Sequence, residues 1–180
     1  MRYTLLFWLP YYYHTAMELS ISSAALVASL FEVGSAVGVL SFGYISDMLE
    51  DGQQGEACVV VALLSTVLLI ICIHVSNFSL VLNILFMTVF GGTSAALDAA
   101  LAATAAQDVS RDSGLGTAVV GTATGAIVGM GSCGAVLQGY LAAEVTKAFG
   151  WTGLFHVLAM LCLASGGLDL ITDAYTYLTP

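Results

Sequence analysis

Hydrophobic residues gather into long runs along this chain, and the short stretches between them hold most of its charged residues. Five long runs lie at residues 24–46, 57–75, 80–104, 115–142 and 151–172, and a shorter one opens the chain at residues 2–14. A helix needs about 20 residues to cross about 30 Å of hydrocarbon. Because the five long runs meet that length, the pattern predicts an all-α membrane protein, with one transmembrane domain over residues 1–180.

The opening run is shorter than a membrane span. Residues 3–13 make about 16 Å of helix, which is about half of a bilayer. We therefore expect a six-helix bundle whose first helix is truncated, or a chain that begins partway through a helix. A cleaved signal peptide is disfavoured, because the apolar stretch contains Pro10 and three consecutive tyrosines.

The connections between the runs are short, which predicts antiparallel neighbouring helices. They are expected at residues 14–23, 47–56, 75–79, 105–114 and 143–150. A cytoplasmic N-terminus would place Arg2 and Arg111 inside and Lys147 outside, in agreement with the positive-inside tendency. The same orientation places the glycosylation sequon at Asn77 outside, very close to the membrane.

Composition narrows the function classes. The chain has 3 basic and 12 acidic residues, a net charge of −9 and 59% hydrophobic residues, so it lacks the basic footprint of a nucleic-acid-binding protein. Its 4 cysteines lie within or at the ends of apolar runs without C-x-x-C spacing, and its 3 histidines are far apart. We predict no metal site, no cofactor and no catalytic constellation, and hence a protein that is not an enzyme.

Two acidic residues, Glu32 and Asp98, interrupt the apolar runs. Intramembrane carboxylates are costly and usually face a cavity or a partner. Glu32 lies deep within its run, and two interpretations stay open: a role in gating or substrate linkage, or a protonated or hydrogen-bonded packing residue. For Asp98 we expect a hydrogen bond that packs helices together.

Small residues recur at helical spacing. Gly121, Gly125 and Gly129 are four residues apart, and Gly34 and Gly38 repeat the spacing on an earlier run. Such ridges let helix backbones approach closely, so we expect helix packing at these glycines. The run at 115–142 also carries threonines and a glutamine, which is unlike a helix that faces only lipid, so it is expected to line a cavity or slide against a neighbour.

Several motifs, in order, resemble one family of transporters. They are Arg2-Tyr3-x4-Trp8-x-Pro10-x-Tyr12, Phe31-Glu32-Val33-Gly34-x3-Gly38-x4-Gly43-Tyr44-Ile45-Ser46-Asp47, the glycine-rich run from Gly116 to Gly131, Gly139-Tyr140 and Phe149-Gly150-Trp151. Together they resemble the seventh, eighth, eleventh and twelfth helices of the sugar-phosphate exchangers, the organophosphate:phosphate antiporters of the major facilitator superfamily. The likeness covers nearly the whole chain.

The resemblance implies a fold and a function. The fold would be a six-helix bundle equivalent to the C-terminal half of a twelve-helix transporter. The function would be antiport of a phosphorylated sugar or glycerol against inorganic phosphate. Substrate sites in this architecture lie at the midplane between two halves, so the implied partners are the bilayer, the two phosphates, and a missing N-terminal half or a homodimer partner. An internal membrane such as the endoplasmic reticulum is expected.

Residue roles follow from the same motifs. Arg2, Tyr3 and Glu32 match substrate-binding positions, and Gly43 and Asp47 match the superfamily's loop motif, which acts in conformational change. The phosphate role of Arg2 competes with a second interpretation, in which Arg2 is an interfacial positive-inside anchor. The chain departs from the family after Asp47, where Glu50 and Asp51 replace the usual basic residues.

Two other function classes stay open on the sequence alone. The chain could be half of a major facilitator transporter for a non-phosphorylated solute, which transport assays with both kinds of solute would separate. It could also be a non-transporting fragment or accessory membrane subunit, which the genomic sequence upstream of Met1 would reveal.

Overall fold

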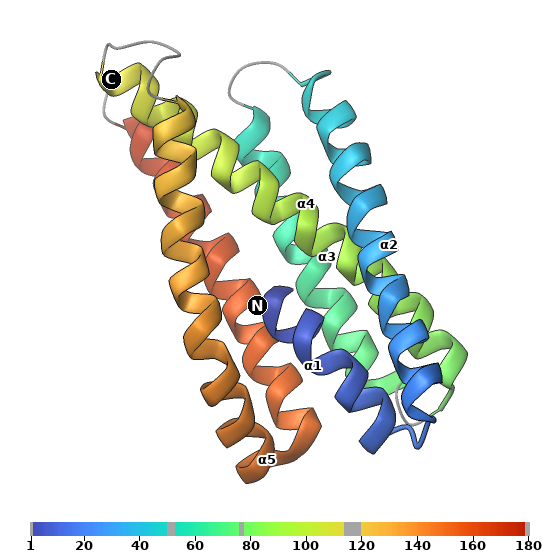
Figure 1. Ribbon diagram of the computed structural model, residues 1–180. Helices are drawn as coiled ribbons and strands as arrows, with labels where there is room; N and C mark the ends of the chain where they lie inside the picture. The colour runs from blue at the N-terminus through green and yellow to red at the C-terminus, as the bar shows by residue number, and fades with distance from the viewer. Residues whose placement is uncertain (1, 50–52, 76–77, 114–119, 179–180) are drawn as a thin grey trace.

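The computed structural model describes residues 2–49, 53–75, 78–113 and 120–178, with side chains over 2–49, 55–75, 78–103 and 120–167. All regular structure in these residues is helical. The helices are listed in chain order: α1 (Arg2–Thr15), α2 (Ile21–Ser46), α3 (Gln53–Val75), α4 (Leu80–Ser113) and α5 (Val120–Leu178). Figure 1 shows them side by side in one bundle, with successive helices running in opposite directions.

The expected count of six separate helices is not confirmed, because the last two expected helices form the single element α5. Its backbone leaves helical geometry at Gly150, where φ is 70° and ψ is −173°. A positive φ is strained for residues with a side chain, and glycine adopts it freely. Two helical arms meet at this point and run side by side in opposite directions (Figure 1).

Two of the expected loops are also largely helical. The expected loop at 105–114 belongs to α4 as far as Ser113, and the expected loop at 143–150 is helical up to Gly150. Each stretch holds two alanines, which favour helix without being strongly apolar. Lys147 also donates to Glu144 at 3.0 Å, one helical turn away. The end of an apolar run is therefore not the end of its helix.

Short polar segments set the other helix ends. Ser20 caps α2 by accepting a hydrogen bond from the Ser23 N–H at 3.2 Å, so α2 begins at Ile21, before the expected residue 24. The turn before it is closed by the His14 ring, whose Nδ1 lies 2.8 Å from the Leu19 carbonyl oxygen. This turn brings α2 back against α1 and fixes how the two helices meet.

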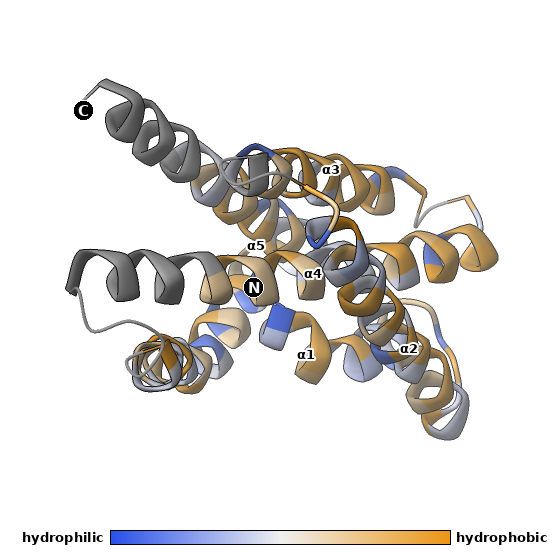
Figure 2. Ribbon diagram, turned by 90° about the horizontal axis from the view of Figure 1, so that it is seen from above, coloured by the Kyte–Doolittle hydropathy of each residue, from blue (hydrophilic) through white to orange (hydrophobic). Residues whose placement is uncertain are grey.

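Apolar side chains cover the outside of the bundle as well as its core. Four of the described helices are long and apolar enough to cross a bilayer, namely α2, α3, α4 and α5. Leu26, Val37 and Leu40 on α2 are 68%, 59% and 75% exposed. Figure 2 shows hydrophobic colour on outward faces of the helices. Exposing so much apolar surface to water would be energetically unfavourable. The chain is therefore an integral, multi-pass membrane protein.

Candidate functional site

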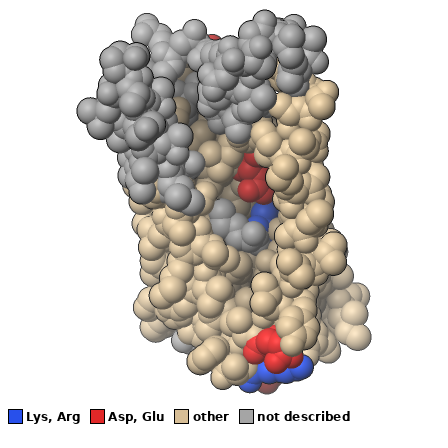
Figure 3. Space-filling model, turned by 90° about the vertical axis from the view of Figure 1, so that its left-hand side faces the viewer, with Lys and Arg blue, Asp and Glu red and all other residues tan. Residues whose placement is uncertain are grey.

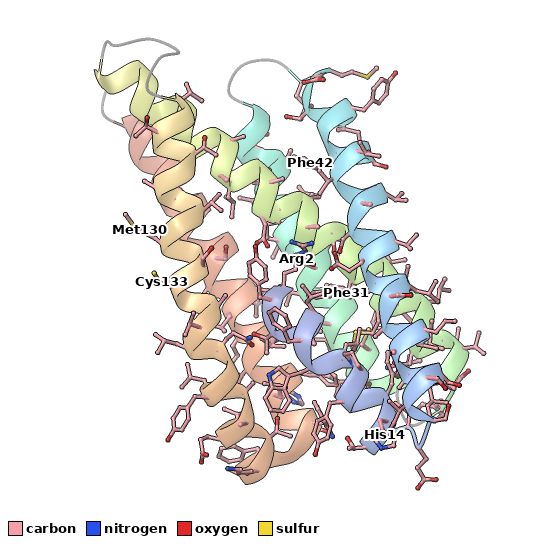
Figure 4. The ribbon with its side chains drawn as sticks, viewed as in Figure 1. Arg2, His14, Phe31, Phe42, Met130 and Cys133 are labelled. Atoms are coloured by element: carbon pink, nitrogen blue, oxygen red, sulfur yellow. The ribbon has the colours of Figure 1, made fainter. Side chains whose placement is uncertain are left out.

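The site is built around Arg2, which lies at the first turn of α1. Figure 1 places this end of the chain about halfway along the bundle, and Figure 4 labels Arg2 at that height. The α1 helix packs against α2, α4 and α5. Arg2 therefore lies about halfway along the bundle, and its role, either phosphate binding or interfacial anchoring, stays a prediction.

Arg2 forms an ion pair with Glu32 of α2. Its Nη2 lies 3.3 Å from Oε2 and 3.5 Å from Oε1 of the carboxylate. The Arg2 side chain is 21% exposed and that of Glu32 is 43% exposed, so the pair opens onto a hollow instead of being sealed in the core. Figure 3 shows basic and acidic atoms together in a hollow at mid-height of the bundle.

The Arg2 guanidinium has an N–H group that its ion pair with Glu32 does not use. Its Nε is buried and has no hydrogen-bond partner among the described residues. The Tyr3 ring lies beside it, with the ring centroid 5.8 Å from the central guanidinium carbon, which is within cation–π range. Arginine presents a planar fork of N–H groups that matches phosphate and carboxylate oxygens. The structure thus brings together Arg2, Tyr3 and Glu32, and the arrangement can bind an anion.

Asp98 does not make the packing hydrogen bond expected of it: among the described residues its carboxylate has none. Its side chain is exposed on α4.

Gly43 and Asp47 lie at the far end of α2 from its capped N-terminus. The Asp47 N–H donates to the Gly43 carbonyl at 3.0 Å and closes the last turn of the helix, and the Asp47 side chain is exposed. No atom lies within 4 Å of a Cβ built at Gly43. Within the described residues the motif ends a helix, and its role in conformational change stays a prediction.

The two glycine ridges have opposite surroundings. A Cβ built at Gly34 or Gly38 would collide with the α4 backbone, at Thr88 and Gly92 respectively. By contrast, no atom lies within 4 Å of a Cβ at Gly121, Gly125 or Gly129. Among the described residues, no side chain or backbone packs against these three glycines. Their ridge is an open face of the first arm of α5, and packing against another helix unit stays a prediction.

The sequence did not point to the residues on α4 that pack against Gly34 and Gly38. Gly91 and Gly92 on α4 face α2, and the Ser35 hydroxyl donates across the interface to the Gly91 carbonyl at 3.1 Å. The adjacent glycine pair within the run at 80–104 was the available signal. The sequence reasoning looked for small residues four apart, such as Ala95 and Ala99 on this run, and the glycine pair does not have that spacing.

An aromatic cluster joins α1 to the second arm of α5 and was also missed. Trp151 stands between Tyr11 and Tyr12, with ring centroids 5.6 and 5.2 Å away. Tyr12 also meets Phe155 edge to face at 5.0 Å. These contacts lie close to the bend at Gly150, so they give the Phe149-Gly150-Trp151 motif a structural role. Asn77, the candidate glycosylation site, lies outside the described residues.

Comparison with known proteins finds relatives along most of the chain. It is 33% identical over 173 residues to "Putative glycerol-3-phosphate transporter 5" of Arabidopsis thaliana, with 91% of the chain and 34% of that protein covered. It is 31% and 32% identical over 158 residues to the glucose-6-phosphate exchangers SLC37A1 of Mus musculus and Homo sapiens, with 87% of the chain and 29% of each covered. The chain thus spans about a third of the length of these relatives. No family model matches it, and no solved structure matches it significantly.

Proposed function

We propose that this chain, a homologue of the organophosphate:phosphate antiporters of the major facilitator superfamily, supplies one half of a transporter that exchanges a phosphorylated sugar or glycerol for inorganic phosphate. The half would be the six-helix C-terminal one, with α1 and the two arms of α5 as its first and last two helices. The relatives are named as transporters and exchangers. Accordingly, we propose no chemistry on the substrate.

One observation carries the proposal: a guanidinium lies at mid-depth with an unused donor. Its Nε has no partner among the described residues, and its ion-pair distances of 3.3 and 3.5 Å are long for charge-assisted hydrogen bonds. A phosphate could therefore compete for Arg2 without removing a tightly held partner. Tyr3 would border the bound group from the same turn of α1.

Alternating access needs a second six-helix unit on the other side of the substrate. We propose that this unit packs over the hollow that holds Arg2, and that the open glycine ridge of α5 is one of the surfaces it contacts. It would be either an N-terminal half or a second copy of this chain. The three relatives are eukaryotic, and we propose the endoplasmic reticulum or another internal membrane as the location.

Binding by the chain itself tests the substrate class. In lipid nanodiscs, the chain should broaden the phosphorus NMR line of inorganic phosphate. Glucose-6-phosphate or glycerol-3-phosphate should relieve the broadening at concentrations at least about ten-fold lower than glucose or glycerol, since the phosphate group is the part that the guanidinium recognises. Equal relief by the neutral sugars would instead favour a transporter half for a non-phosphorylated solute.

A transport assay on the chain alone tests whether a second six-helix unit is required. Reconstituted by itself in liposomes loaded with phosphate, the chain should show no saturable uptake of radiolabelled phosphate, because its hollow faces no second half. Empty liposomes give the background rate. Robust saturable exchange would contradict the need for an N-terminal half, and cross-linking would then show whether two copies form the transporter.

A further inference from the structure

A pocket of about 260 Å³ lies at the end of the bundle where α1 ends and α5 bends. Its walls include three aromatic rings, those of Tyr12 on α1 and of Trp151 and Phe155 on the second arm of α5. A single water molecule needs only about 10 to 15 Å³ on the same measure, so the pocket has room for a group of several atoms. It is separate from the ion pair, because Tyr12 lies about 15 Å further along α1 than Arg2.

The pocket lies at the boundary of the membrane. Ile73, which lines it from α3, is close to the end of the candidate span Gly55–Val75. Met17 lines it from the turn between α1 and α2, and Trp151 follows the bend at Gly150. Figure 1 shows the end of α1 and the bend of α5 at the same end of the bundle. Tryptophan and tyrosine at such positions lie at the level of the lipid headgroups, so a headgroup reaches this pocket more readily than an acyl chain does.

Charge at this end of the bundle favours a cation. None of the residues that line the pocket is an acid or a base of the Asp, Glu, Lys or Arg type. Glu18 follows the lining residue Met17 directly, is exposed, and forms no ion pair among the described residues. Lys147, near the bend, is paired with Glu144 at 3.0 Å, so its charge is offset. The carboxylate of Glu18 is therefore the charge left without an opposite partner here.

Aromatic rings attract cations through their electron-rich faces, and cages of several rings recognise quaternary ammonium groups. In this pocket the Tyr12 ring is inclined at 69° to that of Trp151 and at 84° to that of Phe155. Rings set at steep angles present surface to more than one side of a bound group, as the walls of a cage do. A primary ammonium is strongly hydrated, whereas a trimethylammonium group has an apolar surface that suits such walls.

We propose that the pocket binds the trimethylammonium group of a phosphatidylcholine headgroup from the surrounding bilayer. The inference goes beyond the proposed transport function and does not depend on it. Each partly exposed ring contact with a cation contributes a factor of about two to five in affinity. Three rings together should therefore favour the cation over an uncharged group of the same shape by at least about ten-fold.

The test uses choline and its uncharged carbon isostere, 3,3-dimethylbutanol, titrated onto the chain in maltoside micelles. Tryptophan fluorescence reports binding, because the chain has 2 tryptophans, Trp8 and Trp151, whose ring centroids are 6.3 Å apart. Choline should bind at least about ten-fold more tightly than the isostere. Short-chain phosphatidylcholine should displace choline, and phosphatidylethanolamine with the same chains should do so only at several-fold higher concentration.

Two variants link this preference to the rings. Phe155→Leu removes one ring and should lower the ratio of choline affinity to isostere affinity about two- to five-fold. Trp151→Phe keeps a ring but loses the strongest cation–π partner, so it should lower the ratio as well. Trp8→Phe is the control, because Trp8 packs against Trp151 without lining the pocket, and it should leave the ratio unchanged. Circular dichroism checks that each variant is folded.

Equal binding of choline and the isostere, or binding of neither, would overturn the inference. An unchanged ratio in folded Phe155→Leu and Trp151→Phe would do the same. Binding of choline without displacement by phosphatidylcholine would overturn the lipid headgroup as the occupant. Each of these results would leave the phosphate site untouched, because the pocket shares no residue with the Arg2–Glu32 pair.

Discussion

Gly38→Ala is expected to destabilise the bundle by at least about 3 kcal/mol, the upper end of the usual range for overpacking. The added methyl would collide with the backbone of Gly92 on α4, not with the end of a flexible side chain. Backbone atoms cannot rotate away, so α2 and α4 would have to separate. That separation would also stretch the hydrogen bond from Ser35 to the Gly91 carbonyl, which spans 3.1 Å.

The measurement is unfolding of the purified chain in detergent, followed by circular dichroism. Gly125→Ala is the matched control: it makes the same change within a helix, at a glycine where a Cβ would meet nothing within 4 Å. It should stabilise the chain slightly, by up to about 1 kcal/mol, because alanine favours helix over glycine. Equal stability of the two variants would refute the close approach of α2 and α4.

Arg2→Lys is expected to weaken phosphate binding at least ten-fold, which corresponds to about 1.4 kcal/mol. Lysine keeps the positive charge but loses the planar fork that can hold two phosphate oxygens at once. It also loses the equivalent of the buried Nε, which has no partner among the described residues. Phosphorus NMR titration of the chain in nanodiscs measures the affinity, and circular dichroism confirms that the variant is folded.

The control is Lys147→Arg, which makes the reverse exchange at an exposed cation whose partner is Glu144. It should not change phosphate affinity, because Lys147 lies on the first arm of α5 near the bend, away from the hollow. If Arg2→Lys binds phosphate as tightly as wild type, then Arg2 only holds α1 against α2 through Glu32, and the phosphate role is lost.

The two glycine ridges show that the sequence can predict a face suited to helix packing, whereas the fold decides whether a helix packs there. Gly34 and Gly38 have the same spacing as Gly121, Gly125 and Gly129, so the sequence predicts the same packing for both. Among the residues that the structure describes, only the first ridge meets another helix. Spacing places small residues on one face of a helix, but whether another helix lies against that face depends on how the helices are arranged in space.

The Arg2–Glu32 ion pair is a second example. Family resemblance singles out both residues, yet they are 30 positions apart, and neither hydropathy nor spacing puts them in contact. The contact exists because the turn closed by His14 and capped by Ser20 brings α2 back along α1.

The sequence by itself determined that this is a helical membrane protein, because the length and hydrophobicity of a run decide whether a segment can cross a bilayer. It also indicated the family, which relatives matching 87 to 91% of the chain support. Only the tertiary structure decided that Gly150 joins two arms into one bent element, that α2 and α4 touch backbone to backbone, and that Glu32 pairs with Arg2. These features depend on contacts between segments far apart in the chain, and hydropathy and spacing carry no information about them.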